Sequence, residues 1–320
     1  GQCVRITTGA VMPEGCDSVV VQEVVRKETE SQETESQETR QQHQPAGTRI
    51  WVPAGQSAGQ NRRLAGEDLA AGKPALRAGT RMNPAAIGLL ASIGLTQVPV
   101  VQRLRVAILS TGDELCPPGE ALRPGQIYDS NRHTLWGLLQ QLGCEVIDLG
   151  MVRDDPLLLE AALRQAAASA DAVITSGGVS VGEADFVKAM LDRLGEVVFW
   201  KIAMKPGRPL AYGHIGGAHF FGLPGNPVSV MVTFYQFVRD ALLKLSGRDP
   251  LPSVPCFRVP CTTPLKKAPG RTEFQRGVLT QDAAGNWSVA VTGEQGSGIL
   301  RSMCEANCFI ILPTDQGNVG

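Results

Sequence analysis

The sequence predicts a multidomain α/β protein whose largest part is a doubly wound, mostly parallel sheet. From Leu104 onward, short apolar runs alternate with helical patterns, which is typical of βαβ units. After Gly247 prolines cluster and the apolar runs become short again. We therefore expect a partial β-rich domain, a partial helical domain, the α/β domain and a small, truncated C-terminal β-barrel, over residues 1–60, 61–103, 104–249 and 250–320.

The first two parts have weaker patterns. Two β-like runs, 17–25 and 49–55, flank residues 27–46, which repeat Ser-Gln-Glu-Thr and contain almost no apolar side chains. Such a segment cannot build a core, so we expect a disordered insertion that extends a β-hairpin loop. A helical pattern runs over 61–95, and its clearest stretch has Asn83 as a cap, Pro84 in the first turn and Gly94 as a stop.

The α/β part has regular elements. We expect strands over 105–112, 145–152, 171–178, 196–204, 208–215 and 218–225. Helices are expected over 130–143, 154–170, 184–195 and 226–247, and short C-terminal strands over 273–279, 287–293 and 308–313.

Composition excludes several classes of protein. The net charge is −1, so no overall basic surface indicates nucleic acid, and no run of eighteen apolar residues indicates a membrane span. The first residues resemble neither a signal peptide nor a domain start, so we expect a fragment. The eight cysteines form no C-x-x-C pair, which favours reduced thiols in a cytoplasmic protein over a zinc site.

The loops after the predicted strands place glycine turns and charged residues at one rim of the sheet. In a doubly wound fold, ligands bind beyond the carboxyl ends of the strands. Glycine turns such as Ser176-Gly177-Gly178 suit phosphate, and carboxylates beside phosphate suit magnesium, a heterocycle or a ribose. The rim also carries several acids and two lysines: Asp113, Glu114, Asp154, Asp155, Asp185, Lys201 and Lys205.

Helix capping is the competing explanation for each acid. For Asp155, which precedes Pro156, capping is favoured, and for Asp129 or Ser130 capping and catalysis are equally supported. Five acids at one rim are more than capping requires. The sequence has no P-loop, no G-x-G-x-x-G and no G-x-S-x-G elbow, and His133 falls within a helix.

Taken together, these loops resemble the molybdenum insertase family, the molybdopterin molybdenumtransferases that include the C-terminal domain of gephyrin. The resemblance spans most of the chain in order. It rests on "RITTGAVMPEGCDSVVVQE", "STGDEL", "GQIYDSN", "RDDP", "TSGGVSVGEADFVK", "KIAMKPGRPLAYG", "GLPGNPVS" and "FQRGVL". The family's N-terminal segment precedes Gly1, and the insertion 27–46 departs from the family's hairpin.

The resemblance implies a transferase of molybdenum cofactor biosynthesis. It implies a molybdopterin-binding α/β domain that inserts molybdenum from molybdate into adenylylated molybdopterin and releases AMP. Mg²⁺, a homodimer, a cytoplasmic location and contact with a molybdopterin adenylyltransferase are implied as well. Such a substrate explains a rim that offers amides, carboxylates and cations together.

Site residues also follow from the resemblance. Ser176, Gly177 and Gly178 would cradle phosphate, and Glu114, Asp154 and Asp185 match catalytic and metal-binding acids. Substrate and molybdate contacts are implied for Thr8, which reaches the partner subunit's site, and for Lys201, Lys205, Asn226, Arg276 and Ser297. Lys201 and Lys205 are four apart, so on one strand they would share a face and, with Arg276, form a positive pocket.

Two other functions remain open from the sequence. A gephyrin-like scaffold would bind peptides along a dimer interface and would not require the acidic and cationic rim. A molybdopterin adenylyltransferase would share the α/β domain alone, whereas this chain has flanking domains. Binding of adenylylated pterin rather than free ATP separates the insertase from the adenylyltransferase.

Overall fold

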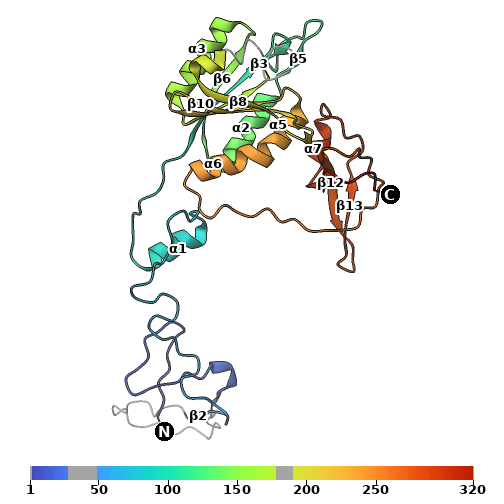
Figure 1. The fold of residues 1–320 in the computed structure, drawn as a ribbon. Helices are drawn as coiled ribbons and strands as arrows, with labels where there is room; N and C mark the ends of the chain where they lie inside the picture. The colour runs from blue at the N-terminus through green and yellow to red at the C-terminus, as the bar shows by residue number, and fades with distance from the viewer. Residues whose placement is uncertain (1, 28–48, 178–189, 320) are drawn as a thin grey trace. The chain divides into compact units, whose positions relative to one another are not determined.

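The computed structural model describes residues 2–27, 49–177 and 190–319. The chain forms two compact units, Gly1–Leu76 and Arg77–Gly320, shown as ribbons in Figure 1. Among the described residues, no helix is both long and apolar enough to cross a membrane. The division into four domains stays a prediction.

The first unit consists mainly of turns. The strand β1 (Arg26–Lys27) pairs antiparallel with β2 (Ile50–Trp51), which confirms a hairpin around the insertion, although residues 28–48 lie outside the described part. The strand expected over 17–25 is wrong. The Val19 N–H donates to the Gln60 carbonyl, and Gln22–Val24 is a short 3-10 helix (η1), so these backbone groups bond to loops rather than to a ladder.

A single helix, α1 (Pro84–Ser92), forms within the expected helical stretch. Its cap is as expected: the Asn83 side chain accepts from the Ala86 N–H at 2.8 Å, and Gly94 has φ +82°. The helical expectation over 61–82 is wrong, because that segment forms turns with Gly66, Gly72 and Gly79 in the left-handed region.

The second unit contains a six-stranded sheet in the order β6-β3-β7-β11-β10-β8. The strands are β3 (Arg105–Thr111), β6 (Glu145–Val152), β7 (Ala172–Ser176), β8 (Gly195–Lys201), β10 (Pro209–Ile215) and β11 (Ala218–Leu223). The first four in spatial order are parallel, and β10 is antiparallel to both of its neighbours. The multidomain α/β prediction is confirmed, and the sheet itself is mixed.

Helices cover both faces of this sheet (Figure 1). Because side chains alternate along β3, Val106 and Ile108 face one layer while Ala107 and Leu109 face the other. The first layer contains α2 (Asn131–Leu142), α5 (Pro227–Thr233) and α6 (Arg239–Leu245), with the π-helical turn η2 (Phe234–Val238) between the last two. The second contains α3 (Pro156–Ser169) and Met190 and Leu191, from a helical segment that ends at residue 194.

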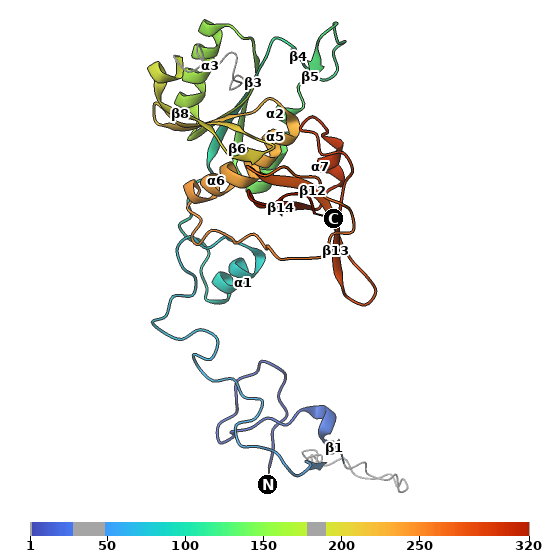
Figure 2. The same ribbon diagram turned by 45° about the vertical axis from the view of Figure 1, so that its right-hand side comes forward.

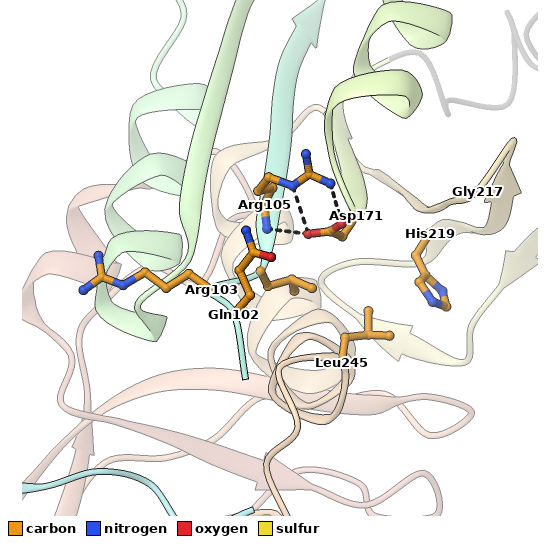
Figure 3. Close-up of a pocket in the computed structure, with 8 residues that line it drawn as sticks. Gln102, Arg103, Arg105, Asp171, Gly217, His219 and Leu245 are labelled. Atoms are coloured by element: carbon orange, nitrogen blue, oxygen red, sulfur yellow. Dashed lines mark hydrogen bonds and ion pairs between the residues drawn. The ribbon is translucent and has the colours of Figure 1, made fainter. Parts of the chain in front are cut away.

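An ion pair joins two strands where they begin. Asp171 accepts from the Arg105 backbone N–H at 2.8 Å and from its Nη2 at 2.9 Å (Figure 3). These hydrogen bonds lower the pKa of Asp171 below its ordinary value. The pair lines a pocket of about 370 Å³ with Gln102, His219 and Leu245, at the amino-terminal edge of the sheet and therefore at the edge opposite the rim predicted to bind ligand.

The C-terminal part forms a second sheet (Figure 2). Its strands β12 (Thr272–Gln281), β13 (Trp287–Val291) and β14 (Cys308–Leu312) occur where expected, and β9 (Met204–Lys205) pairs with β12 in parallel. A barrel is not confirmed, because the ladders of the described residues form an open path with β12 at the centre.

Arg276 on β12 is buried beneath a loop. Its side chain is 1% exposed, and Nε donates to the Ser302 hydroxyl at 2.9 Å while Nη2 donates to the Gly296 carbonyl at 3.0 Å. Burial lowers the pKa of Arg276 from its ordinary value. The guanidinium therefore holds the loop between β13 and α7 (Arg301–Glu305) against the sheet.

Replacement of Arg276 tests this structural role. In Arg276→Met the stem remains but Ser302 and the Gly296 carbonyl lose their donor, so we expect a loss of about 1–3 kcal/mol in free energy of unfolding. Urea unfolding measures it, with Arg271→Met as the control at the exposed position directly before β12. Equal stability of both variants would contradict the role.

The pH dependence of stability tests the Arg105–Asp171 pair. A carboxyl whose folded pKa is lowered contributes stability above its unfolded pKa, about 3.9, and loses it as pH falls through the folded pKa. The difference in stability between the parent and Asp171→Asn should therefore be constant near neutrality and shrink below about pH 4. Asp192→Asn, at an exposed position, is the control for the substitution itself. A gap for Asp171→Asn that is independent of pH would contradict the assignment.

Candidate functional site

The described strands β3, β6, β7, β11 and β8 all end at one edge of the sheet. The edge strand β8 is antiparallel to β10, which is antiparallel to β11, so β8 runs in the same direction as β7. Lys201 at the end of β8 therefore reaches the same edge as Ser176. The registers place them three strand spacings apart, about 14 Å, which suits an elongated ligand.

The glycine turn begins directly after β7. Ser176 is buried, and Gly177 has φ +91° and donates its N–H to the Leu223 carbonyl at 3.2 Å. A side chain at Gly177 would collide with the Thr111 carbonyl oxygen, so this position requires glycine. Gly178, like Glu183 and Asp185, lies outside the described residues.

Asn131 joins three segments beside this turn and was missed by the sequence reasoning. Its Nδ2 donates to the Ser176 hydroxyl at 2.8 Å and to the Gly225 carbonyl at 2.6 Å. The available signal was its place in "DSN", directly before the helical pattern, but from the sequence only the two preceding residues were weighed as caps.

Asp129 acts as a structural cap. It is 1% exposed and accepts from the Arg132 N–H at 3.2 Å, from Arg132 Nε at 2.9 Å and from the Ser110 hydroxyl at 3.0 Å. Arg132 also pairs with Asp148. The side chain of Ser130 makes no capping bond, so Asp129 is the residue whose side chain caps α2.

The acids after β3 and β6 are solvent-exposed and close in space. The Asp154 N–H donates to Asp113 Oδ1 at 3.3 Å, and Glu114 follows Asp113 in the same loop. Asp155 accepts from the N–H groups of Leu157 and Leu158, which confirms its capping role. In the part of the chain that the structure describes, no group of three or more His, Cys, Asp or Glu residues is arranged to hold a metal.

The two lysines belong to different sheets. The Ile202 N–H still donates to the Arg208 carbonyl, but the chain then leaves the large sheet, and β9, which carries Lys205, pairs with β12 of the second sheet. The expectation that the two lysines share one strand face is therefore wrong. Lys201 is exposed at the end of β8, whereas Lys205 on β9 forms an ion pair with the buried Glu273 of β12 at 3.3 Å.

The C-terminal part also reaches the loop before α5. The Val228 N–H, in the first turn of α5, donates to the Ser297 carbonyl at 3.1 Å. Asn226 is the exposed N-cap residue of this helix and makes no side-chain capping bond. Arg276 lies buried below the loop that carries Ser297, so its guanidinium does not join the lysines in an open pocket.

Thr8 belongs to the first unit. It is exposed in a turn closed by the Ala10 N–H and the Thr7 carbonyl at 3.0 Å. The structure thus brings the glycine turn, the exposed acids and Lys201 to one edge of the large sheet, and it places Ser297 against the first turn of α5, directly after Asn226.

Substitution of Gly177 tests the geometry of the turn. Gly177→Ala combines a positive φ with a backbone collision, so we expect a loss of about 1–3 kcal/mol of stability. Gly137→Ala, in α2 where nothing lies within 4 Å of an added Cβ, is the control and should be neutral or stabilising. Thermal unfolding measures both, and an unaffected Gly177→Ala would show that the turn does not need glycine.

Comparison with known proteins identifies the family. Three family models match in order: the MoeA N-terminal region (domain I and II) over residues 1–94, a probable molybdopterin binding domain over 107–244 and the MoeA C-terminal region (domain IV) over 258–320. The molybdopterin molybdenumtransferase of Haemophilus influenzae is 46% identical over 99% of this chain and 74% of its own. The molybdopterin molybdenumtransferase 2 of Mycobacterium tuberculosis is 36% identical over 97% of this chain and 73% of its own.

A solved structure agrees with this assignment. The MoeA molybdopterin biosynthesis protein of Pyrococcus horikoshii superposes with a TM-score of 0.74 and 27% identity, over 99% of this chain and 72% of that one. Gephyrin of Dictyostelium discoideum is 34% identical over 99% of this chain but only 46% of its own length. The chain belongs to the molybdopterin molybdenumtransferase family, transferases of molybdenum cofactor biosynthesis.

Proposed function

We propose that this chain inserts molybdenum from molybdate into adenylylated molybdopterin and releases AMP. The observation that supports this best is the shared edge at which a glycine turn, exposed acids and Lys201 meet. A substrate with a pterin at one end and a nucleotide at the other is elongated, and the separation of roughly 14 Å between Ser176 and Lys201 suits it.

The glycine turn is proposed to hold phosphate. Ser176 ends the parallel strand β7, and Gly177 opens the turn beyond its carboxyl end, which is the position at which doubly wound sheets bind their ligands. Asn226, exposed at the first turn of α5, would contact the substrate from the adjacent loop. The Ser176 side chain is held by Asn131, so its part is to fix the turn rather than to move.

Glu114, Asp154 and Asp185 are proposed to hold Mg²⁺. Glu114 and Asp154 are exposed carboxylates on neighbouring loops, and carboxylate oxygens are the donors this hard cation prefers. The donor chemistry of the two described residues therefore fits. When bound, Mg²⁺ would neutralise charge on the phosphates that link the pterin to AMP.

Lys201, Lys205 and Ser297 are proposed to attract molybdate. Lys205 and Ser297 lie on the segments that join the second sheet to the first, and both lysines are partly open to solvent. The proposed contribution of Arg276 to this site is indirect, because its guanidinium holds the loop that carries Ser297.

We also propose that the protein acts in the cytoplasm as a homodimer in which Thr8 completes the partner's site. An adenylyltransferase would supply the substrate, because the reaction consumes an adenylylated pterin. Light scattering tests the dimer, and a monomer with full turnover would contradict the shared site.

Molybdate-dependent release of AMP tests the function. Purified protein is mixed with adenylylated molybdopterin, Mg²⁺ and molybdate, and AMP is measured with time. Release that depends on molybdate is expected. Binding of free ATP with no release of AMP from the adenylylated pterin would instead favour an adenylyltransferase.

Loss of Lys205 should weaken the binding of molybdate. Removing a cation beside a doubly charged anion is expected to raise the half-saturating molybdate concentration about ten- to a hundredfold in Lys205→Ala. Lys244→Ala is the control: it removes an exposed lysine of α6 that pairs with Asp249, and it should leave the half-saturating molybdate concentration unchanged. An unchanged value in Lys205→Ala would place the molybdate elsewhere.

Loss of Glu114 should raise the Mg²⁺ requirement. Glu114→Gln keeps the shape and removes one anionic ligand, so AMP release should need about tenfold more Mg²⁺. Glu120→Gln, exposed on the same loop region, is the control. Identical Mg²⁺ titrations for both variants and the parent would argue against a metal-binding role for Glu114.

A further inference from the structure

Two buried polar atoms beside the glycine turn have no partner. They are Oδ1 of Asn131 and Oγ1 of Thr111, and the Thr111 residue is only 5% exposed. Folded proteins pair the great majority of buried polar atoms, so two orphans in one place require an explanation. One explanation is a ligand that supplies the missing hydrogen bonds.

The orientation of the Asn131 amide is fixed by its neighbours. Nδ2 lies 2.6 Å from the Gly225 carbonyl oxygen, so a flipped amide would press two acceptors against each other. Both Nδ2 hydrogens are used, one on Ser176 and one on Gly225. The atom left over, Oδ1, can only accept a hydrogen bond.

The two orphan atoms share one place in the fold. Ser110 of β3 is the register partner of Ser176 of β7, so Thr111 lies beside Gly177 in the next row. A Cβ added to Gly177 would lie 3.1 Å from Thr111 Oγ1. Asn131 bonds directly to Ser176. Both orphans therefore border the turn proposed to hold phosphate.

We propose that Thr111 and Asn131 contact the substrate, and that Thr111 bonds to an acceptor and Asn131 to a donor of the same ligand. The Thr111 hydroxyl would donate to a phosphate oxygen in the turn. Asn131 Oδ1 would accept from a hydroxyl or N–H group of the substrate, because phosphate oxygens offer no hydrogen to it. This inference rests on the proposed function and identifies which groups of the adenylylated pterin the turn distinguishes.

The Thr111 hydroxyl allows a clean test. Thr111→Val keeps the shape and removes an unpaired hydroxyl, so the free protein should be equally or more stable. If the hydroxyl binds substrate, KM for adenylylated molybdopterin should nevertheless rise about three- to tenfold. The matched control is Thr233→Val, which removes another buried, unpaired hydroxyl, one that lies against Gly207. That variant should leave KM unchanged.

Comparison with a Ser176 variant distinguishes substrate contact by Asn131 from a purely structural role. Ser176→Ala breaks the bond between Asn131 and the turn but leaves Oδ1 in place. If Asn131 contacts substrate, Asn131→Ala should reduce kcat/KM at least several-fold more than Ser176→Ala. Thermal unfolding of each variant shows how much of the loss is instability.

Two results would overturn the inference. They are a KM for Thr111→Val within twofold of the parent, and losses in Asn131→Ala no greater than in Ser176→Ala. Failure of the proposed function is recognised separately, because the parent would then release no AMP. In that case, calorimetric binding of adenylylated molybdopterin to the same variants still decides whether the two residues contact it.

Discussion

The parallel ladder of β3, β7 and β11 is the constraint on which the rest of the second unit depends. These strands are buried on both faces, so their side chains pack against α2, α5 and α6 on one side and α3 on the other. Parallel strands require crossover connections, and the connections emerge at the carboxyl ends. The glycine turn, the acids after β3 and β6, and the loop before α5 are therefore neighbours because the ladder is parallel.

The second sheet is tied to the first through a short segment that leaves the large sheet. After β8 the chain turns at Ile202, and β9 then pairs with β12. The Lys205–Glu273 ion pair reinforces the contact of β9 with β12 inside the second sheet, and the bond between Val228 and Ser297 ties α5 to the loop before α7. Because Glu273 is buried, its charge needs Lys205 and Gln275 as partners, which couples a proposed substrate residue to the packing of the second sheet.

Stability and function place different demands on the rim. Asp129 satisfies the N-terminus of α2 and binds Ser110 and Arg132, so it behaves as a fully paired structural group. Two residues after Asp129, Asn131 bonds to two loops but its Oδ1 has no partner, and the hydroxyl of Thr111 has none either. Leaving buried polar atoms unpaired costs free energy in the absence of a ligand, and a ligand that pairs them would recover it. Such groups are found where a protein has been shaped by binding rather than by folding alone.

The sequence by itself determined the order of the elements and much of the rim. Alternating apolar runs located β3, β6, β7, β10 and β11, and Asn83, Asp155 and Gly94 acted as caps and stops because those signals are local. The tertiary structure decided what depends on distant partners. Residues 17–25 bond to loops and form no strand, and Lys205 lies in a different sheet from Lys201. Arg276 is buried below the loop that carries Ser297. Asn131 could not be identified from the sequence for the same reason: its two partners, Ser176 and Gly225, are 45 and 94 residues away, and only the folded sheet brings them together.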